Sequence, residues 1–376
     1  MRQSRPQHIL IATPFGENGK GGIDRMMDII RQQAQNDLND DIEIRFVTTR
    51  GTGIVLLSIV RYFIPSIFLL TYLRIAWPID VFHINIVQRG STIRKMMLSR
   101  LAQMMGVPYI LHLHGSQYRD YWDSAGPILS KQIREIFEKA ARVLVLGQPW
   151  AEYVGGKAPY AQIEILPNAT VAPAQAREHR DREEPIGILF LGQIGARKGV
   201  PELLQALAQL NRSPAWRATL AGDGQVEAAR RQVTDAGIAG LVDVIGWAGP
   251  AEVERLLAGS DILVLPSHHE NLPLSVIEGM AYGLAVVATP VGAVTDIIID
   301  GETGLLCPVG EPIALASALQ RLLQDAPLRA RLGRSARTFH AERLNATQYL
   351  SKLKATWRDV RCQPDPTAQP QAGSHA

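Results

Sequence analysis

Two carboxylates in the C-terminal half of the chain, Glu270 and Glu278, lie on either side of a predicted helix start. Pro273 is typical of a first helical turn, and the amides of residues 274–276 would have no acceptor inside that helix. Such amides and the helix dipole attract anions, so the segment could bind a diphosphate. Glu270 could then face a sugar ring, and Glu278 could accept hydrogen bonds from a ribose diol. The pattern Ser275-x-x-Glu278 is also a capping box, which is the structural alternative for Glu278.

A second candidate phosphate site is the loop of residues 192–199, with the sequence GQIGARKG. It connects an apolar run to a predicted helix over residues 200–210, and its adjacent cations are Arg197 and Lys198. A glycine-rich turn with cations before a helix suits a phosphate group. The alternative is a solvated basic pair on a turn. The candidate diphosphate site near Glu278 favours the phosphate interpretation.

Two histidines, His112 and His114, occur at the end of a predicted strand over residues 109–112. Strand geometry places both on one face, with His114 nearer to the edge where ligands would bind. His114 could donate or accept a hydrogen bond with a sugar hydroxyl, or stabilise developing charge. Packing and metal ligation are the alternatives, and no third ligand is close in the sequence.

A glycine-rich segment, residues 16–22 with the sequence GENGKGG, follows the first predicted strand. It is not a Walker A motif, which would need Gly in place of Pro14 and Ser or Thr in place of Gly21. It also lacks the dinucleotide fingerprint. The segment indicates either a backbone that can approach a ligand closely or a tight turn.

Short β-branched runs alternate with helical patterns in two series, which predicts an α/β protein with parallel sheets covered on both faces. The predicted strands are residues 8–12, 42–47, 81–84, 109–112 and 142–146 in the first series, and 186–191, 217–221, 242–245, 262–265 and 286–288 in the second. Three helical patterns follow, over residues 312–324, 327–338 and 343–358. Ligands of such sheets bind beyond the carboxyl ends of the strands, where the candidate loops lie.

A proline-containing and charged stretch between the two series has the composition of a linker. We therefore expect an N-terminal acceptor-binding domain, a linker, a C-terminal nucleotide-sugar-binding domain, a helix that returns to the N-terminal domain and a disordered tail. These occupy residues 1–170, 171–185, 186–340, 341–361 and 362–376, respectively.

The composition excludes several classes of protein. The 376 residues are enough for two domains, and 39 Lys and Arg against 36 Asp and Glu give a net charge of +3 without a basic stripe, which argues against a nucleic-acid partner. The two cysteines, Cys307 and Cys362, are far apart and indicate neither a disulfide framework nor a zinc site. No signal peptide is recognisable, so we expect a cytoplasmic protein.

The most apolar stretch, residues 54–77, is interrupted by Arg61, Pro65 and Arg74. Its uninterrupted part is too short to cross a bilayer. We expect an amphipathic helix that touches the inner face of the cytoplasmic membrane, or, as an alternative, a helix packed on a sheet.

The residues now described resemble glycosyltransferase family 4, a family of retaining enzymes with the GT-B fold of two Rossmann-like domains facing each other across a cleft. The most specific match is residues 270–283, with two glutamates separated by seven residues and a following Met-Ala-x-Gly. Supporting matches, in the expected order, are Gly21-Gly22, His114-Gly115, Lys198-Gly199, residues 221–224 (AGDG), Pro266-Ser267 and residues 300–306 (DGETGLL). One departure is Gln193, where the family usually has arginine, which leaves open whether Arg197 supplies that charge.

The resemblance implies a role for each matching residue. Glu270, His114 and Lys198 would be catalytic, with Glu270 on the transferred sugar, His114 on its far side or at the reaction centre, and Lys198 on the donor diphosphate. Gly22 would let the backbone approach the phosphate. The implied donor-binding residues are Gly22, Arg197, Lys198, Gly222, Asn271, Leu272, Pro273, Leu274, Ser275 and Glu278.

By the same resemblance, the chain would transfer a hexosyl unit from a UDP- or GDP-sugar to a saccharide acceptor, with retention and without a metal ion or other cofactor. The acceptor would be a polyprenyl-diphosphate-linked intermediate of bacterial polysaccharide synthesis, bound by the N-terminal domain through Tyr118, Arg119 and Trp122. Two alternatives remain at this point: a nucleotide-sugar epimerase of the same fold, and a non-catalytic protein that binds sugar nucleotides.

Overall fold

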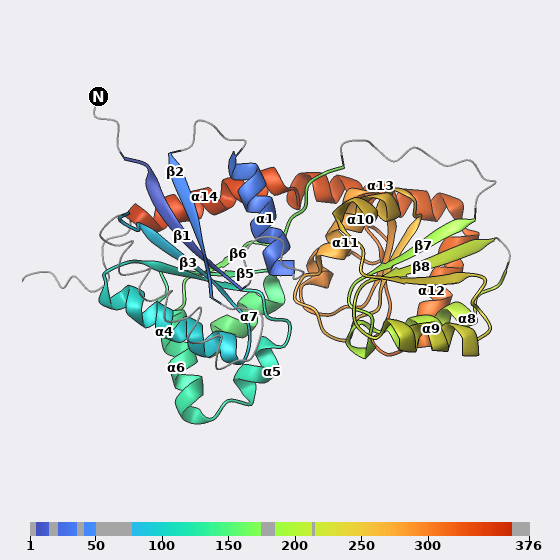
Figure 1. Ribbon diagram of the computed structural model, residues 1–376, viewed down its shortest axis with the longest axis horizontal. Helices are drawn as coiled ribbons and strands as arrows, with labels where there is room; N and C mark the ends of the chain where they lie inside the picture. Colours follow the sequence, from blue (N-terminus) through green and yellow to red (C-terminus); the bar gives the residue numbers. More distant parts are fainter. Residues whose placement is uncertain are drawn as a thin grey trace, which may run out of the picture. The chain divides into compact units, whose positions relative to one another are not determined.

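The computed structural model describes residues 5–14, 22–35, 41–49, 77–173, 185–212 and 215–362 (Figure 1). The chain forms two compact units. The first comprises Met1–Val145, Ala151–Leu166 and Leu350–Ala376, and the second comprises Leu146–Trp150 and Pro167–Tyr349. Four predicted features lie wholly or mostly outside the described residues: the glycine-rich loop before Gly22, the apolar stretch, the linker and the tail.

The first unit contains a six-stranded parallel sheet with the order β2-β1-β3-β4-β5-β6. Every residue of β1 and β3 is buried, as expected for strands covered on both faces. The strands are β1 (Gln7–Thr13), β2 (Ile42–Thr48), β3 (Val81–Ile86), β4 (Tyr109–Leu113), β5 (Arg142–Val145) and β6 (Ile163–Ile165). The helices of this part of the chain are α1 (Gly22–Gln35), α4 (Gly90–Met104), α5 (Tyr118–Asp123), α6 (Pro127–Glu138) and α7 (Gln148–Lys157).

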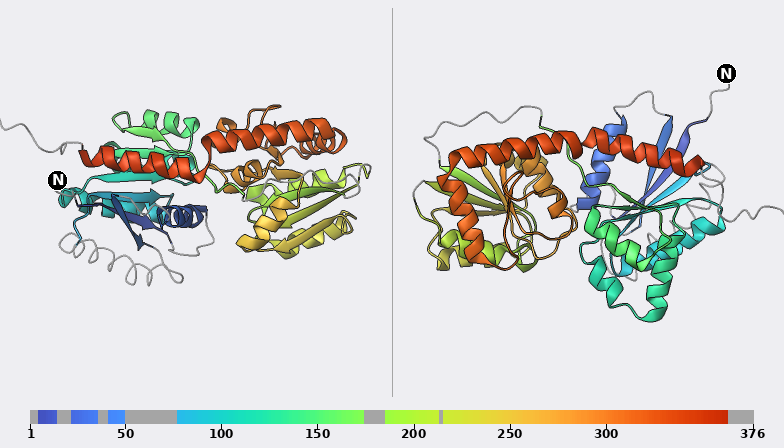
Figure 2. Two further views of the ribbon diagram at one scale, coloured as in Figure 1. Left: turned by 90° about the horizontal axis from the view of Figure 1, so that it is seen from above. Right: turned by 180° about the vertical axis from the view of Figure 1, so that it is seen from behind.

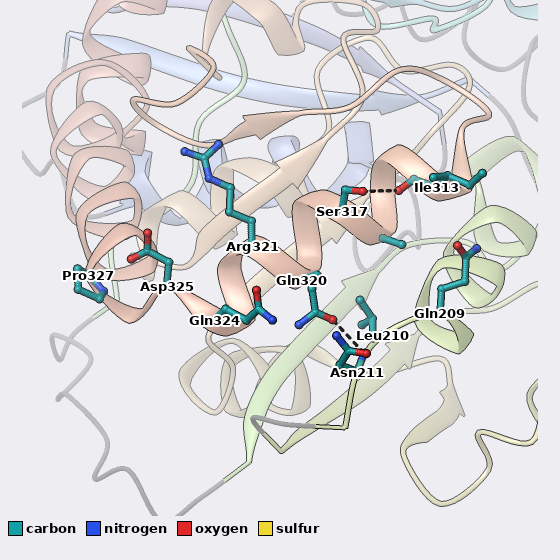
Figure 3. Close-up of a pocket in the computed structure, with 11 residues that line it drawn as sticks. Gln209, Leu210, Asn211, Ile313, Ser317, Gln320, Arg321, Gln324, Asp325 and Pro327 are labelled. Carbon is teal, nitrogen blue, oxygen red and sulfur yellow. Dashed lines mark hydrogen bonds between the residues drawn. The ribbon is translucent and has the colours of Figure 1, made fainter.

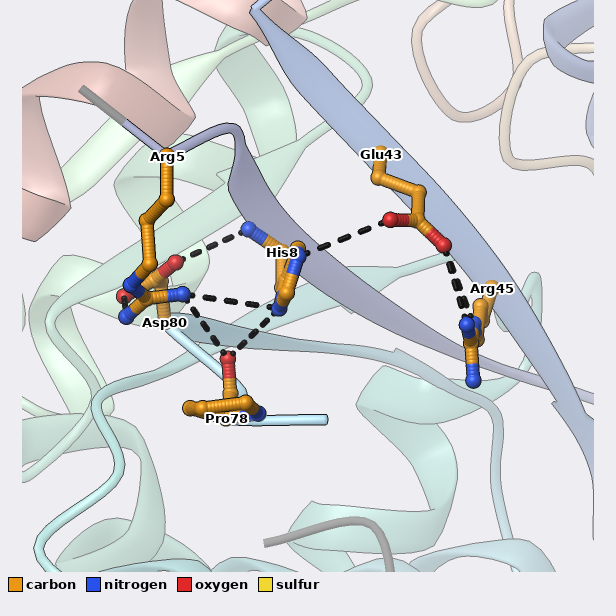
Figure 4. Close-up of polar contacts among 6 residues, drawn as sticks. All are labelled: Arg5, His8, Glu43, Arg45, Pro78 and Asp80. Atoms are coloured by element: carbon orange, nitrogen blue, oxygen red, sulfur yellow. Dashed lines mark hydrogen bonds and ion pairs between the residues drawn. The ribbon is translucent and has the colours of Figure 1, made fainter. Parts of the chain in front are cut away.

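A polar cluster holds the amino end of this sheet together (Figure 4). Arg5 pairs with Asp80 at 2.8 Å, and the other carboxylate oxygen of Asp80 accepts a bond from the backbone amide of His8 at 2.8 Å. The His8 ring lies 3.5 Å from Glu43 on β2 and stacks on Trp77 with ring centroids 4.3 Å apart. The amino ends of β1 and β2 and the segment before β3 are thereby tied to one another, leaving the opposite edge for the candidate site.

The last helix, α14 (Ala346–Cys362), belongs to the first unit from Leu350 onward. Trp357 is fully buried, and its indole Nε1 donates to Nδ1 of His83 at 3.2 Å. Its carbonyl oxygen accepts a bond from the side chain of Gln7 at 2.7 Å. The C-terminal part of the chain therefore supplies part of the packing of the first sheet (Figure 2).

The second unit repeats the architecture with a parallel sheet of the order β12-β11-β10-β7-β8-β9. Its strands are β7 (Ile186–Leu191), β8 (Trp216–Ala221), β9 (Val242–Gly246), β10 (Ile262–Leu265), β11 (Ala285–Ala288) and β12 (Leu305–Leu306). Its helices are α8 (Val200–Ala208), α9 (Val226–Asp235), α10 (Pro250–Ala258), α11 (Leu274–Ala281), α12 (Pro312–Gln324) and α13 (Ala326–Arg343), with the 3-10 turns η2 (Ala196–Lys198) and η3 (Val294–Asp296).

These two sheets confirm the prediction of an α/β chain with two parallel sheets. All ten predicted strands are present, with ends that differ by no more than two residues. The edge strands β6 and β12 are missing from the prediction because three and two residues, respectively, are too few for a recognisable pattern. Within the described part of the chain, no helix has the length and apolar character needed to span a membrane.

Candidate active site

The loop after β10 leads into α11 at the carboxyl edge of the second sheet. Pro273 is the N-cap residue, with φ −73° and ψ 127°, and the amides of residues 274–276 precede the first helical hydrogen bond, which runs from the Ile277 amide to the Pro273 carbonyl. Ser275 therefore lies within the first turn and not at the N-cap. The capping-box alternative for Glu278 is wrong, because Glu278 lies one turn inside the helix, where its side chain is buried.

Glu270, in the same loop, is buried against two cations from the loop after β7. Its Oε1 accepts a bond from Nζ of Lys198 at 2.5 Å and lies 4.0 Å from Nη1 of Arg197. The side chains of Glu270 and Lys198 are 8% and 12% exposed. The pair is charge-assisted and largely shielded from solvent, so removing either partner would leave the other buried charge poorly compensated. The second carboxylate oxygen of Glu270 has no hydrogen-bond partner within the described ranges.

Backbone contacts hold the two loops together. The amide of His268 donates to the carbonyl of Arg197 at 2.9 Å, and Nη1 of Arg197 donates to the carbonyl of His269 at 3.2 Å. Arg197 is thus directed toward the Glu270 loop. Gly199 has φ +70°, and a Cβ there would lie 1.9 Å from the carbonyl oxygen of Pro266, so only glycine fits between the loops.

Further contacts position the rest of the predicted donor-binding residues. A Cβ at Gly222, after β8, would lie 1.8 Å from the carbonyl oxygen of Gly192, so the backbones of two neighbouring loops touch there. Asn168 donates from Nδ2 to the carbonyl of Leu272 at 2.8 Å, and both Asn168 and Asn271 are buried. The sequence interpretation missed Asn168, because only the fold brings it to the loop before α11.

In the first unit, His114 follows β4 and is half-buried. Its ring packs against His112 with centroids 4.1 Å apart, and its Nε2 lies 2.9 Å from Oδ1 of Asn85 on β3. Burial lowers the pKa of His114 to about 3, so the imidazole is neutral at physiological pH. The hydrogen-bonding role predicted for His114 is compatible with this state, whereas stabilisation of charge by an imidazolium is not.

A third histidine, His83 on β3, lies beside this pair. The indole of Trp357 donates to His83 Nδ1, so His83 carries its proton on Nε2, which lies 3.3 Å from Nδ1 of His112. Burial lowers the pKa of His83 to about 3 and that of His112 well below its ordinary value. Across the described residues, no group of three or more metal-ligating side chains is arranged to hold a metal ion. Hydrogen bonds between neutral groups therefore join Trp357 to His83 and His83 to His112, whereas His112 and His114 are in ring contact and Nε2 of His112 has no partner among the described residues.

The predicted acceptor residues require a correction. Tyr118 and Trp122 lie one turn apart on α5 and are 0% and 1% exposed, packed with Phe137 in an aromatic cluster. They cannot contact an acceptor, so the prediction for these two residues is wrong. Arg119, on the opposite face, is exposed and lies over the ring of Tyr153 at 4.9 Å.

The remaining predicted residue, Gly22, begins α1 and is exposed. Asp24 lies in the first turn of the same helix and is buried. The loop before Gly22, residues 15–21, lies outside the described residues.

A cavity of about 760 Å³ lies elsewhere in the second unit (Figure 3). It is lined by polar and apolar side chains of α12, by Asp325 and Pro327, and by residues 209–211, which follow α8 and precede β8. Because Asn211 comes before the amino end of β8, the cavity is at the edge of the sheet opposite to the Glu270 loop. It is not part of the candidate donor site.

Comparison with known proteins agrees with this geometry. Residues 172–339 match the family described as "Glycosyl transferases group 1". The chain is 27% identical over 281 residues to the alpha-D-kanosaminyltransferase of Streptomyces kanamyceticus, covering 69% of this chain and 72% of that one.

Two solved structures show the same fold. Sucrose-phosphate synthase of Thermosynechococcus elongatus superposes with a TM-score of 0.76 and 19% identity, covering 94% of this chain and 99% of that chain. Anabaena Alr3699/HepE, determined in complex with UDP, has a TM-score of 0.72 and 18% identity, with 94% and 100% of the two chains covered. The GT-B fold predicted from the sequence is thereby confirmed.

The buried pair of Lys198 and Glu270 generates a testable prediction. We expect Lys198→Met to lower the free energy of unfolding by about 3 kcal/mol, because it leaves a buried carboxylate unpaired. The double variant Lys198→Met/Glu270→Gln should recover most of this loss, since the amide carries no charge. Urea unfolding of the four proteins in a double-mutant cycle measures the coupling, and Arg255→Met, which breaks an exposed pair with Glu252, is the matched control. Equal stability of Lys198→Met and wild type would show that the pair is not shielded.

The three histidines of the first unit predict acid sensitivity. Their pKa values are depressed in the folded state, so below pH about 6.5 the unfolded chain binds more protons. Stability should be complete above pH 6.5 and should be lost as the pH falls, by about 1.4 kcal/mol per histidine and pH unit. Unfolding free energies measured at pH 7, 6, 5 and 4 should give a shallower slope for His112→Leu than for wild type. The exposed His269→Gln should keep the wild-type slope; a His112→Leu slope equal to it would contradict the assignment.

Proposed function

We propose that the chain is a group 1 glycosyltransferase, as the match of residues 172–339 suggests, and that it transfers a hexosyl unit from a nucleoside diphosphate sugar to a hydroxyl group of a saccharide, with retention of the anomeric configuration. The observation that carries the proposal is the buried Glu270 held by Lys198 immediately before the free amides of α11. This arrangement joins a sugar-binding carboxylate to an anion-binding helix start. The UDP in the HepE structure supports a nucleotide ligand for this fold.

In the proposed complex the diphosphate lies at the start of α11, where the amides of residues 274–276 and the dipole of the helix favour negative charge. Lys198 is already in place and can share its ammonium group between Glu270 and a phosphate oxygen. Glu278, buried one turn further on, accepts hydrogen bonds from the ribose. The second oxygen of Glu270 accepts a bond from a sugar hydroxyl.

Cleavage of the bond between sugar and phosphate develops negative charge on the diphosphate and positive charge at the anomeric carbon. Lys198, Arg197 and the α11 amides stabilise the leaving group as it forms, and this contribution grows toward the transition state. We propose no covalent nucleophile and no metal ion: the acceptor attacks from the face that the diphosphate leaves. His114, neutral at physiological pH, holds a sugar hydroxyl by a hydrogen bond.

For the acceptor we propose a lipid-linked saccharide of bacterial polysaccharide synthesis, reached at the cytoplasmic face of the membrane. The outer face of α4 supports a membrane contact: Ile93, Met97 and Met104 are 42%, 48% and 84% exposed and fall on one side of the helix. Arg100 is exposed on the same side, and α4 contains no carboxylate. An apolar stripe flanked by cations suits an anionic lipid surface.

Donor binding gives the direct test of the function. The screen is a thermal-shift assay with UDP-, GDP-, ADP- and dTDP-sugars. Sugars that carry one of these nucleotides should stabilise the protein by about 2.7 kcal/mol at a concentration of 100 times their Kd. Glu278→Ala should weaken that donor by about tenfold or more, because a bond to a charged group is lost. Glu270→Ala should mainly lower turnover, by about 10²-fold or more, because a contact that strengthens in the transition state is removed.

The exposed Glu254→Ala on α10 is the control for both variants. Loss of melting temperature in Glu278→Ala with unchanged donor affinity would show that Glu278 is structural. An epimerised nucleotide sugar as the only product would overturn the transfer reaction, and binding without turnover with any acceptor would indicate a binding protein.

The membrane contact has its own test. We expect wild-type protein to sediment with vesicles that contain phosphatidylglycerol and not with pure phosphatidylcholine vesicles. The variant Met97→Glu/Met104→Glu should lose this binding, since it places two charges on the apolar stripe. Ile313→Glu, at an equally exposed apolar position on α12, should bind as wild type does. Sedimentation of the double variant at the wild-type level would exclude α4 as the contact.

A further inference from the structure

We propose that Asn85 is a positioning residue that makes His114 a hydrogen-bond acceptor for a hydroxyl group of the donor sugar. The inference rests on the proposed function, in which His114 contacts that sugar. Asn85 belongs to none of the sequence motifs that carry the resemblance, and it lies on β3, a strand that precedes the His114 segment in the chain.

The first bond fixes the orientation of the Asn85 side chain. Its Nδ2 donates to the carbonyl of Ala12 on β1 at 3.1 Å. A carbonyl oxygen can only accept, so the amide nitrogen must be on that side and Oδ1 must face β4. Asn85 is 2% exposed, and Nδ2 also contacts the sulfur of Met27 at 3.5 Å, so the side chain has no room to turn over.

The second bond fixes the proton on His114. Oδ1 of Asn85 lies 2.9 Å from Nε2 of His114 and can only accept, so Nε2 carries the proton. Because burial keeps the ring singly protonated, Nδ1 then holds a lone pair. No described residue forms a hydrogen bond with this nitrogen. The backbone amide of His114 donates to the carbonyl of Ile86 at 3.0 Å, and the ring rests against His112, so its direction is also fixed.

A ring in this state selects the chemistry of its ligand. Nδ1 accepts a hydrogen bond from a hydroxyl group and has no proton to donate to a carbonyl, a fluorine or a phosphate oxygen. With a pKa of about 3, His114 is too weak a base to remove a proton at neutral pH. His114 therefore recognises and orients a sugar hydroxyl. Asn85 determines that His114 is the acceptor in this hydrogen bond.

The test exchanges Asn85 for an isosteric carboxylate. In Asn85→Asp the carboxylate still accepts from Nε2, but an adjacent negative charge should raise the pKa of His114 by about 1–3 units. The ring then becomes an imidazolium at mildly acidic pH and can no longer accept a bond. We expect the affinity of this variant for UDP-glucose, or for the nucleotide sugar preferred in the thermal-shift screen, to fall by up to about fourfold between pH 8 and pH 5.5. The affinity of wild type should stay constant over the same range.

Three controls separate positioning from structure. Asn85→Leu removes the acceptor without adding charge, so its affinity should be reduced at every pH and show no trend. Thr92→Val removes another buried polar contact in the same unit, to the carbonyl of Val87, and should bind the donor as wild type does. The third control uses wild-type protein and donor analogues in which a single hydroxyl is replaced by hydrogen or by fluorine. At the hydroxyl that His114 binds, both replacements should lower the affinity equally, because neither can donate a hydrogen bond.

The proton position is measured directly by ¹⁵N–¹H correlation spectra of histidine-labelled protein without ligand. His114 should show a protonated Nε2 and an unprotonated Nδ1 in wild type. A proton on Nδ1 in wild type, or a flat affinity profile in Asn85→Asp over a pH range in which the same spectra show His114 becoming doubly protonated, would overturn the inference. Failure of the proposed function is seen separately, as the absence of any nucleotide-sugar binding by wild-type protein.

Discussion

The candidate donor site depends on one buried contact, the ion pair between Lys198 and Glu270. The pair is possible because β7 and β10 are neighbours in the second sheet, so the loops that follow them emerge side by side. Loop contacts through Arg197, His268 and Gly199 then bring the backbones close enough for a lysine side chain to reach the carboxylate. Without Lys198, the buried carboxylate would keep only Arg197, 4.0 Å away, to compensate its charge. The parallel topology thus brings a compensating cation to a buried carboxylate at the proposed sugar-binding position.

At the corresponding edge of the first sheet, the buried histidine side chains are neutral, in contrast to the buried ion pair of the second unit. The histidines of the first unit are kept neutral by burial, and each proton is directed by a partner that can only donate or only accept: the indole of Trp357 toward His83 and the amide of Asn85 toward His114. Since Trp357 belongs to the last helix, the proton arrangement in the first sheet depends on the far end of the chain.

Much of this architecture was predictable because parallel strands are apolar, short and regularly spaced, and the ten longer strands follow that rule. The sequence also indicated the two carboxylates and the two cations, because residue type and position before a helix are local properties. It did not indicate Asn85, His83 or Asn168, whose roles depend on strand register and on contacts between residues far apart in the chain. The polar residues within the otherwise apolar run of residues 81–86 were the available signal for the first two.

The two errors have a common physical cause. Tyr118 and Trp122 were assigned to the acceptor by their chemistry, but they are four residues apart on a short helix and therefore share one face, which is the buried one. Ser275 and Glu278 have the spacing of a capping box, but the helix begins earlier, at Leu274, so the spacing falls inside it. In both cases the position of the helix start and the face that the helix buries decide the role of each side chain.

The three buried histidines of the first unit are neutral, so they cannot supply the positive charge that is proposed to stabilise the leaving diphosphate. Among the described candidate-site groups, that charge is therefore proposed to come from Lys198, Arg197 and the amides of α11. The start of this helix is thus the determining feature of the donor site.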